Sequence, residues 1–267
     1  MELDRELEVA KELALSAGKK IMEIYNRTDS QVSYKEDRSP LTEADTQSNT
    51  IIMNGLRKEF PDDGFLTEEE KDSEERLEKQ RVWIVDPLDG TKEFIKHTGE
   101  FTVNIALTIN GSPEIGVVYV PALDELYFSA RGKGAFAVRN GKKEKLAVSN
   151  REKINEMLLA VSRDHSTEEE KKLSEHFAGT EARGSSLKGL MIAEGKAEAY
   201  FRAGPVNQWD ICAMESVLTE AGGMLTDLTG NRIRYNTRET LIKGFLASNN
   251  RAHREILALI DRIRRGE

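Results

Sequence analysis

Apolar residues recur at helical spacing in two stretches of the first sixty residues. In the first stretch they stand three or four positions apart, at Leu3, Leu7, Ala10, Ala14, Ala17, Ile21 and Ile24. This period predicts an amphipathic helix over 2–25. A second helix is predicted from near Thr42 to Phe60, where a Pro-Asp-Asp-Gly segment ends it.

The middle of the chain is rich in short β-branched and aromatic runs, separated by Asn-Gly, Pro and Gly turn signals. The predicted strands cover 82–85, 101–109, 114–120, 125–130 and 134–139. Because the connections between them are short, we expect these strands to form an antiparallel sheet.

From about residue 150, strands and helices alternate. The predicted elements are strand 158–162, helices 167–177 and 186–195, strand 197–202, helix 210–221, strand 242–247 and helix 250–264. This order is typical of an α/β unit. We therefore expect two subdomains, an α+β part over 1–145 and an α/β part over 146–267, with a cleft between them.

Composition narrows the classes of function. The 267 residues are 38% hydrophobic and 32% charged, with a formal net charge of -8. Such an acidic chain is poorly suited to nucleic-acid polymers or anionic membranes, since both are polyanions, but a bound metal ion can reverse the local sign for a small anion. With no apolar run of roughly 18 residues and no signal-peptide core, we expect no membrane span and a cytoplasmic location. Cys212, the one cysteine, is better explained as a buried thiol than as a nucleophile.

The strongest chemical signal is the segment DPLDGT at 86–91, which directly follows the apolar run 82–85. Its proline turns the chain, so that Asp86 and Asp89 can face one side while the Leu88 carbonyl is exposed. Gly90 permits close backbone approach, and Thr91 begins a predicted short helix whose N-terminus favours phosphate. Carboxylate and carbonyl oxygens are the ligands that Mg²⁺ prefers. The alternative, a turn with two solvated aspartates, is disfavoured by the buried strand before it.

Three more carboxylates could join this site. Glu68 is the first carboxylate after the apolar pair Phe65-Leu66. The acidic residues that follow it are typical of a solvated face. Asp210 stands at the start of a predicted helix, and Asp45 lies in the segment 39–45. For these two the alternative is helix capping or surface charge, and on local pattern alone the capping explanation of Asp210 is the stronger one.

Taken together, these residues resemble the inositol monophosphatase superfamily of magnesium-dependent, lithium-sensitive phosphatases. The family signature, a hydrophobic residue followed by Asp-Pro-x-Asp-Gly-Thr, is present at 85–91. The second signature, Trp-Asp and a helix ending Ala-Gly-Gly, is present at 209–223. A Glu-Glu pair at 68–69 and a Ser-Pro-x-Thr-x-x-Asp segment at 39–45 complete the match. The resemblance implies an α/β fold, the layered αβαβα sandwich of the inositol monophosphatase and fructose-1,6-bisphosphatase type.

The resemblance also implies roles for individual residues. The ligands of two or three Mg²⁺ ions would be Glu68, Asp86, the Leu88 carbonyl, Asp89 and Asp210. Asp45, Thr91 and Glu68 would hold and activate the attacking water, and the amides of Gly90 and Thr91 would cradle the phosphate. Metal ions lower the pKa of water from about 15.7 towards 7, so we expect hydrolysis by metal-activated water without a covalent nucleophile.

The residues after Thr91 bear on the substrate. Lys92-Glu93-Phe94 resembles the 3'(2'),5'-bisphosphate nucleotidase branch of the family, which converts 3'-phosphoadenosine 5'-phosphate to AMP, rather than the inositol branch. Segments 184–188, 204–210 and 237–241 resemble that branch as well. Hydroxyls, amides and an ammonium at 185–188 would form an anion site, although an ordinary helix start with a surface lysine is the alternative. The implied substrate-binding residues are Gly90, Thr91, Arg163, His165, Ser185, Lys188 and Asp210.

One departure from that branch leaves other substrates open. The branch often has Ser-Arg-Ser-His where this chain has Ser-Arg-Asp-His at 162–165, and Asp164 places a negative charge near a bisphosphate. The alternatives are an inositol-1-monophosphatase or a fructose-1,6-bisphosphatase on the same fold. A metal-binding regulatory protein without catalysis is a third, yet no ligand is missing. We expect a homodimer acting on a small phosphorylated substrate.

Overall fold

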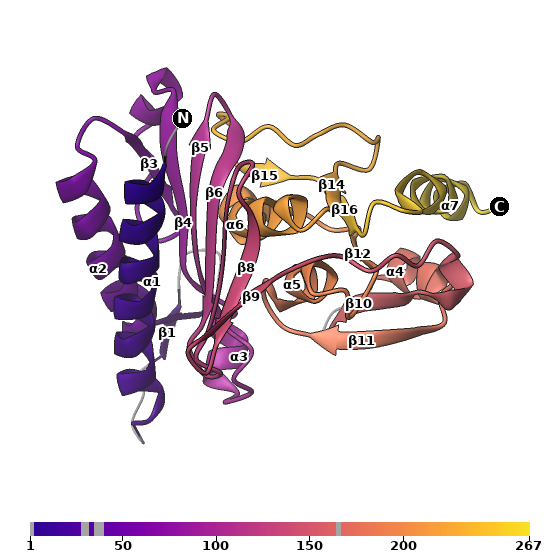
Figure 1. Ribbon diagram of the computed structural model, residues 1–267, viewed down its shortest axis with the longest axis horizontal. Coiled ribbons are helices and arrows are strands. Elements are labelled where there is room, and N and C mark those ends of the chain that lie inside the picture. The colour runs from indigo at the N-terminus through magenta and orange to yellow at the C-terminus, as the bar shows by residue number, and fades with distance from the viewer. Residues whose placement is uncertain (1–2, 28–31, 35–39, 164–166) are drawn as a thin grey trace.

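The computed structural model describes residues 3–27, 32–34, 40–163 and 167–267 and shows five layers in the order α, β, α, β, α. In Figure 1 two long helices cover one face of a large sheet, two further helices separate that sheet from a smaller one, and two helices lie on the outside of the smaller sheet. The layered sandwich predicted from the sequence is therefore confirmed.

The larger sheet has seven strands in sequential order. They are β3 (Gly64–Thr67), β4 (Arg81–Asp89), β5 (Thr102–Ile109), β6 (Ser112–Val120), β7 (Glu125–Ala130), β8 (Gly134–Arg139) and β9 (Lys142–Lys145). Only β3 and β4 pair in parallel, and all later neighbours are antiparallel, as predicted. The prediction missed β3 and β9, because β3 is four residues long and the Lys-Lys-Glu-Lys run of β9 has no apolar alternation.

The smaller sheet has the order β11–β10–β12–β16–β14. Its strands are β10 (Leu158–Ser162), β11 (Gly179–Arg183), β12 (Ala199–Arg202), β14 (Met224–Thr226) and β16 (Phe245–Ser248). Two small ribbons pair β1 (Val32–Tyr34) with β2 (Pro40–Thr42) and β13 (Val206–Asn207) with β15 (Leu241–Ile242).

The predicted strand 242–247 is wrong as one element, because the chain breaks between β15 and β16. Gly244 stands at the break with φ 121°, and a Cβ there would meet the Arg202 carbonyl at 2.7 Å. The left-handed backbone therefore turns the chain from one sheet into another, and only glycine fits the turn.

Seven α-helices are described. They are α1 (Asp4–Tyr25), α2 (Glu43–Glu59), α3 (Thr91–Ile95), α4 (Glu168–Ser174), α5 (Leu187–Ala193), α6 (Gln208–Glu220) and α7 (His253–Arg265), together with the 3-10 turns η1 (Glu75–Glu78) and η2 (Ile154–Glu156). Each predicted helix is present, with ends that differ by up to three residues. The helix predicted at 210–221 begins two residues earlier, which places Asp210 inside its first turn.

Three apolar cores hold the five layers together. Successive side chains of β4 alternate between them, so that Trp83 and Val85 face α1 and α2 while Val82 and Ile84 face α5 and α6. A third core lies between the smaller sheet and helices α4 and α7. Cys212 is buried in the middle core, as expected of a structural thiol, and burial raises the pKa of its thiol well above the ordinary value.

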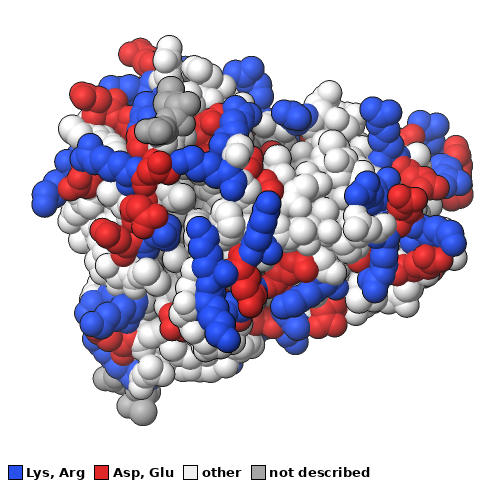
Figure 2. Space-filling view, viewed as in Figure 1, with Lys and Arg blue, Asp and Glu red and all other residues white. Residues whose placement is uncertain are grey.

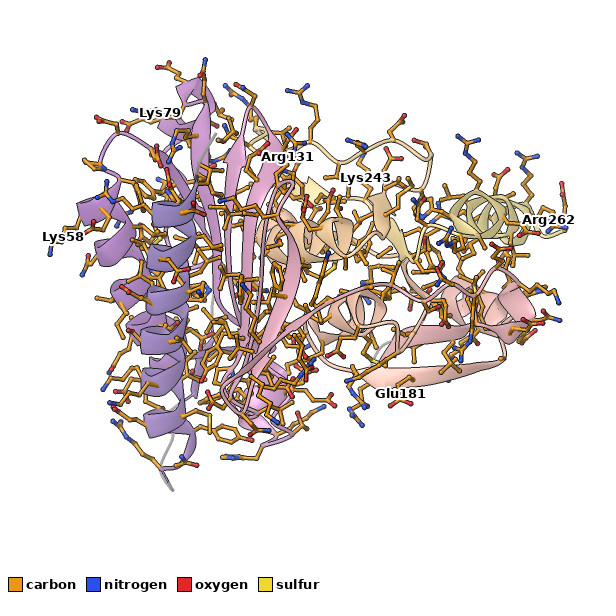
Figure 3. The ribbon with its side chains drawn as sticks, viewed as in Figure 1. Lys58, Lys79, Arg131, Glu181, Lys243 and Arg262 are labelled. Atoms are coloured by element: carbon orange, nitrogen blue, oxygen red, sulfur yellow. The ribbon has the colours of Figure 1, made fainter. Side chains whose placement is uncertain are left out.

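Charged side chains cover the outside of these layers. Figure 2 shows lysine and arginine interspersed with aspartate and glutamate over one face, and in Figure 3 Lys58 and Arg262 lie at opposite outer edges of the ribbon. Within the described ranges, no helix is both long and apolar enough to span a membrane. The division into subdomains 1–145 and 146–267 stays a prediction, which limited proteolysis would test.

Candidate active site

Three carboxylates from separate segments meet where β4 leaves the larger sheet. Glu68 follows β3, Asp86 lies in β4 and Asp210 lies in the first turn of α6, and one oxygen from each lies within 4.8 Å of the others. Asp86 is 1% exposed, and the other two are partly buried. The parallel pairing of β3 with β4 brings Glu68 beside Asp86, because Thr67 is in register with Val85.

The DPLDGT segment forms an irregularity at the end of β4. Pairing with β5 is regular as far as Asp86 opposite Asn104, shifts over the next two residues and resumes at Asp89 opposite Thr102. Such a bulge re-aims side chains at a strand end. The Leu88 N–H donates to the Asp86 carboxylate at 3.1 Å, which fixes the turn.

Gly90 follows with φ 95°, a left-handed conformation that side chains rarely adopt. A Cβ at this position would also lie 3.1 Å from the Glu100 carbonyl oxygen. Gly90 therefore allows two backbone segments to approach closely, as predicted. Helix α3 begins at the next residue, Thr91.

Asp45 is held beside this segment by a capping box at the start of α2. Its carboxylate accepts the Thr42 N–H at 2.7 Å and the Thr42 hydroxyl at 2.5 Å. Its other oxygen accepts the Thr91 hydroxyl at 3.0 Å. Ser48, one turn further along α2, donates to the Pro87 carbonyl at 2.7 Å. The structure therefore brings the predicted pair Asp45 and Thr91 together, and the capping alternative is correct at the same time.

Asp210 also belongs to a capping box, in which its carboxylate accepts the Asn207 N–H at 2.8 Å. Asn207, not Asp210, is the N-cap, since α6 begins at Gln208. Across the site the Ser186 hydroxyl lies 3.0 Å from the Asp89 carboxylate and 3.2 Å from the Asp210 carbonyl oxygen. Ser186 thereby links the two chain segments that carry these aspartates.

The electrostatics of the cluster fit a bound cation. Burial, followed by the charges of Glu68, Asp89 and Asp210, raises the pKa of Asp86 well above its ordinary value. Burial and the charge of Asp89 likewise raise the pKa of Asp210, and burial raises the pKa of Asp89 to about 6. Like charges close together disfavour ionisation unless a cation compensates them. Hard carboxylate and carbonyl oxygens are the donor set of Mg²⁺, so the residues present fit the expected metal.

A cavity of about 210 Å³ adjoins the cluster and extends towards the smaller sheet. Asp89, Gly90 and Asp210 line it together with Lys188 and Arg202. Lys188 is 6% exposed, and its ammonium donates to the Ser185 carbonyl at 2.7 Å and lies 5.2 Å from the centre of the Tyr200 ring. The alternative of a surface lysine is therefore wrong, because this lysine is buried beneath the cavity. Burial lowers its pKa.

Arg163 also lines the cavity, but Glu100 engages its guanidinium. Two guanidinium nitrogens of Arg163 donate to the Glu100 carboxylate at 3.0 and 2.5 Å. The same carboxylate accepts the Gly184 N–H at 2.8 Å, while the Ser185 hydroxyl donates to the Glu100 carbonyl at 3.1 Å. Glu100 therefore anchors both predicted substrate segments. His165 and Asp164 lie outside the described residues.

Sequence reasoning missed two polar groups that the fold brings to the site. Arg202 ends β12 and lines the cavity, and it forms no ion pair with a carboxylate of the described residues. Asn104 in β5 donates to the Ser186 hydroxyl at 3.0 Å and to the Asp89 carboxylate at 3.4 Å. Neither has a local motif. An arginine at the end of a strand in an acidic protein is the only signal that could have drawn attention to Arg202.

Comparison with known proteins agrees with this geometry. The model of the inositol monophosphatase family matches residues 2–265. The chain therefore belongs to the inositol monophosphatase family, whose members are metal-dependent phosphatases.

Within that family, the chain is 43% identical to the 3'(2'),5'-bisphosphate nucleotidase CysQ of Escherichia coli over 244 residues, covering 89% of this chain and 97% of the relative. A solved structure of CysQ from Bacteroides thetaiotaomicron is 34% identical, with a TM-score of 0.80 and coverage of 91% and 97%. A histidinol-phosphatase of Chlorobaculum parvum is 32% identical, with 96% of each chain covered.

Proposed function

We propose that this protein is a Mg²⁺-dependent 3'(2'),5'-bisphosphate nucleotidase that hydrolyses 3'(2')-phosphoadenosine 5'-phosphate to AMP and phosphate. The observation that carries the proposal is the continuity of one cavity. It joins the carboxylate cluster, which suits a metal-assisted phosphate cleavage, to a basic recess with Lys188 and Arg202, which suits a second phosphate.

In this proposal the carboxylates hold two or three Mg²⁺ ions through Glu68, Asp86, the Leu88 carbonyl, Asp89 and Asp210. When bound, these ions neutralise the phosphate and lower the pKa of water. The protein supplies the orientation. Ser186 and Asn104 fix the Asp89 carboxylate by hydrogen bonds at 3.0 and 3.4 Å.

Asp45 and Thr91 are assigned to the attacking water. The Thr91 hydroxyl donates to Asp45 at 3.0 Å, so its oxygen lone pairs are free to accept a hydrogen bond from a water molecule. Burial raises the pKa of Asp45, which suits a group that takes up a proton during the reaction. The amides of Gly90 and Thr91 lie at the end of the same turn and are assigned to the cleaved phosphate.

The other phosphate of the substrate is assigned to the basic recess. Arg202 offers a planar fork of donors that matches phosphate oxygens, and Lys188 and Ser185 lie beside it in the cavity wall. Arg163 lines the same cavity and is assigned to this phosphate as well, and His165 stays a prediction.

Turnover measured side by side on different phosphate esters tests this proposal. We expect a higher kcat/KM for adenosine 3',5'-bisphosphate than for inositol 1-phosphate, fructose 1,6-bisphosphate or histidinol phosphate. Arg202→Met should raise KM for the bisphosphate about 10-fold, the cost of roughly one charged hydrogen-bonding contact. It should barely change KM for adenosine 3'-phosphate, which lacks the second phosphate.

Arg254→Met, at an exposed position of α7, is the matched control and should leave both constants unchanged. A preference for one of the other three esters would overturn the nucleotide assignment while the phosphatase class stands. An equal effect of Arg202→Met on both nucleotides would remove Arg202 from the second phosphate site.

A homodimer and a cytoplasmic location remain predictions of the proposal. Light scattering after size-exclusion chromatography would test the first, and a fluorescent fusion in the source cell would test the second.

A further inference from the structure

Arg76 is a buried arginine outside the site described above. It lies in η1, eight residues after Glu68, and its side chain is 1% exposed. Arginine is almost never fully buried unless its charge is paired, so the partners of Arg76 indicate what the burial achieves.

On one side Arg76 binds the loop that follows Glu68. Two guanidinium nitrogens donate to the Asp72 carboxylate at 2.9 and 2.6 Å, a planar fork that a lysine could not reproduce. The hydrogen bond from Arg76 lowers the pKa of Asp72, as expected of a charge-assisted pair. The loop from Glu68 to η1 is thereby closed on itself.

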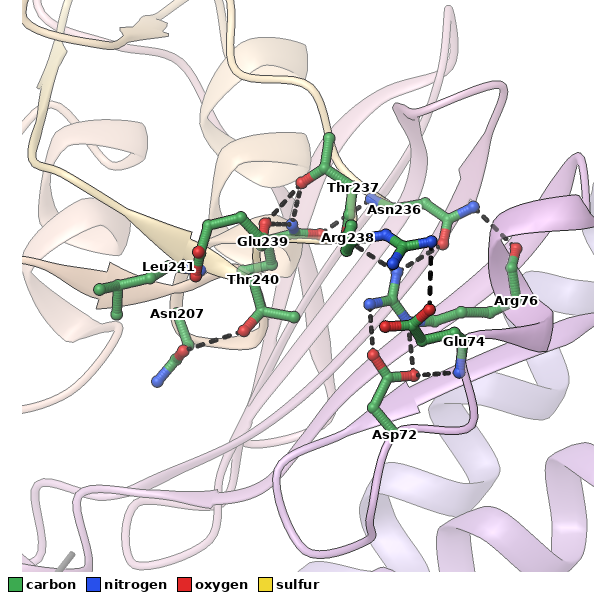
Figure 4. Close-up of polar contacts among 11 residues, drawn as sticks. Asp72, Glu74, Arg76, Asn207, Asn236, Thr237, Arg238, Glu239, Thr240 and Leu241 are labelled. Carbon is green, nitrogen blue, oxygen red and sulfur yellow. Dashed lines mark hydrogen bonds and ion pairs between the residues drawn. The ribbon is translucent and has the colours of Figure 1, made fainter.

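On the other side Arg76 binds a segment about 160 residues away in the chain. Its third nitrogen donates to the Asn236 side-chain oxygen at 2.9 Å and to the Thr237 carbonyl at 3.1 Å. The Asn236 amide donates back to the Arg76 carbonyl at 2.9 Å. Figure 4 shows Arg76 between Asp72 and Asn236, where the loop after β3 meets the segment 236–241.

That segment in turn holds the first turn of α6. The Asn236 N–H donates to the Gln208 side-chain oxygen at 2.8 Å, and the Gln208 side chain donates to the Thr237 hydroxyl at 2.7 Å and the Glu239 carbonyl at 3.0 Å. The Gln208 N–H donates to the Thr240 carbonyl at 3.0 Å. Gln208 is 1% exposed and stands two residues before Asp210.

We infer that Arg76 is a positioning residue for the metal site, which keeps Glu68 and Asp210 at the spacing that a cation needs. The inference rests on the proposed function, because it assumes that these carboxylates bind metal. Glu68 and Asp210 come from opposite parts of the chain, and their like charges push them apart when no cation lies between them. Arg76 ties the loop behind one to the helix start behind the other.

Mn²⁺ binding, followed by the electron paramagnetic resonance signal of the free ion, tests this role without any substrate. Removing the outer hydrogen-bond partners of metal ligands lowers metal affinity about 10- to 100-fold. We therefore expect Arg76→Met to weaken Mn²⁺ binding about 10-fold. Asn236→Ala removes the link while leaving Arg76 in place and should weaken binding in the same direction. Arg76→Lys should recover part of the loss, because it keeps the charge without the fork.

Arg81→Met is the matched control. Arg81 also binds two carboxylates, Asp63 at 2.8 Å and Glu6 at 2.8 Å, but at the opposite end of β4 from the site. Arg81→Met should lower the melting temperature and leave Mn²⁺ affinity within about twofold of wild type, since the partners of Arg81 lie at the far end of β4 from Asp86.

All affinities are measured well below each variant's melting temperature, so that unfolding does not enter. If the wild-type protein binds Mn²⁺ and both Arg76→Met and Asn236→Ala bind it equally well, the positioning role is overturned and the proposed function stands. If the wild-type protein itself binds no Mn²⁺, the proposed metal site fails, and the positioning role fails with it.

Discussion

The carboxylate cluster of the candidate active site and the buried Glu198 place carboxylates in opposite surroundings. Glu198 stands just before β12, is 0% exposed and accepts hydrogen bonds from the Ser149 hydroxyl at 2.7 Å, Arg151 at 2.9 Å and the Leu158 N–H at 2.6 Å. Asp86 is nearly as buried, yet the charges that raise its pKa are those of the carboxylates Glu68, Asp89 and Asp210. One region compensates its buried charge with donors, and the other adds further negative charge.

This difference separates structural from functional burial. A charge that is paired and hydrogen-bonded ties segments together, and removing it leaves its donors unsatisfied. Carboxylates that raise one another's pKa cost stability when no cation lies among them, which is the pattern that a metal site would produce. Substitutions in the two regions should therefore have opposite effects on stability and activity.

The largest effect is expected from Asp86→Asn, which removes one charge from the cluster at almost constant volume. Turnover should fall at least about 1000-fold, since metal ions contribute several kcal/mol to charge stabilisation and each 1.36 kcal/mol is tenfold in rate. The metal-free variant should melt above wild type at pH 8. The pKa of Asp86 is raised in the folded state, so its unfavourable effect is absent at low pH and grows as pH rises.

Activity assays with Mg²⁺ and melting curves with a chelator measure the two quantities. A variant that keeps wild-type turnover would show that Asp86 is not a metal ligand, and a lower melting temperature at pH 8 would show that the cluster stabilises the fold without metal.

The opposite pattern is expected from Glu198→Gln. The Leu158 N–H and the Arg151 guanidinium would lose a charged acceptor, which should lower the free energy of unfolding by about 2 kcal/mol, with turnover unchanged in the folded protein. Urea unfolding measures the loss. Glu152→Gln, at an exposed glutamate next to Arg151 in the sequence, is the control and should cost less than about 0.5 kcal/mol. Loss of turnover at full folding would contradict the division between the two regions.

The local sequence pattern is sufficient to predict those candidate site residues that lie together in one segment of the chain. The end of β4 and its DPLDGT turn are contiguous, so an apolar run followed by turn residues identified Asp86 and Asp89. Asp45 and Asp210 were harder, because capping and metal or water binding use the same residue type at the same helix position, and both boxes are present. The family resemblance, not the local pattern, carried those two.

The remaining features depend on contacts that no sequence window contains. β11 was missed because Gly-Thr-Glu-Ala-Arg has no apolar alternation, and its pairing with β10 decides its conformation. Arg202 enters the cavity because β12 ends there, and Arg76 reaches Asn236 across about 160 residues. Each of these positions is set by topology.

A smaller and more gradual effect is expected at His253, a third kind of buried titratable group. His253 is 4% exposed, and its ring lies between the Thr226 hydroxyl at 2.9 Å and the Ser248 hydroxyl at 2.7 Å; burial lowers its pKa to about 4. An ordinary histidine in the unfolded chain has a pKa of about 6.5. Between about pH 4 and 6.5, therefore, His253 is protonated in the unfolded chain and neutral in the folded protein. The stability that neutral His253 provides is complete above pH 6.5 and declines as pH falls, by about 2 kcal/mol between pH 7 and 5.

Buried carboxyl groups have the opposite pH dependence and hide this decline in the wild type. Burial raises the pKa of Glu215 to about 7 and that of Asp89 to about 6, so both destabilise the fold more as pH rises. The contributions of these carboxyl groups cancel in the difference in unfolding free energy between wild type and His253→Gln, which leaves the contribution of the histidine. We expect this difference to shrink as pH falls from 7 to 5, and a constant difference would show that His253 is not held neutral in the folded protein.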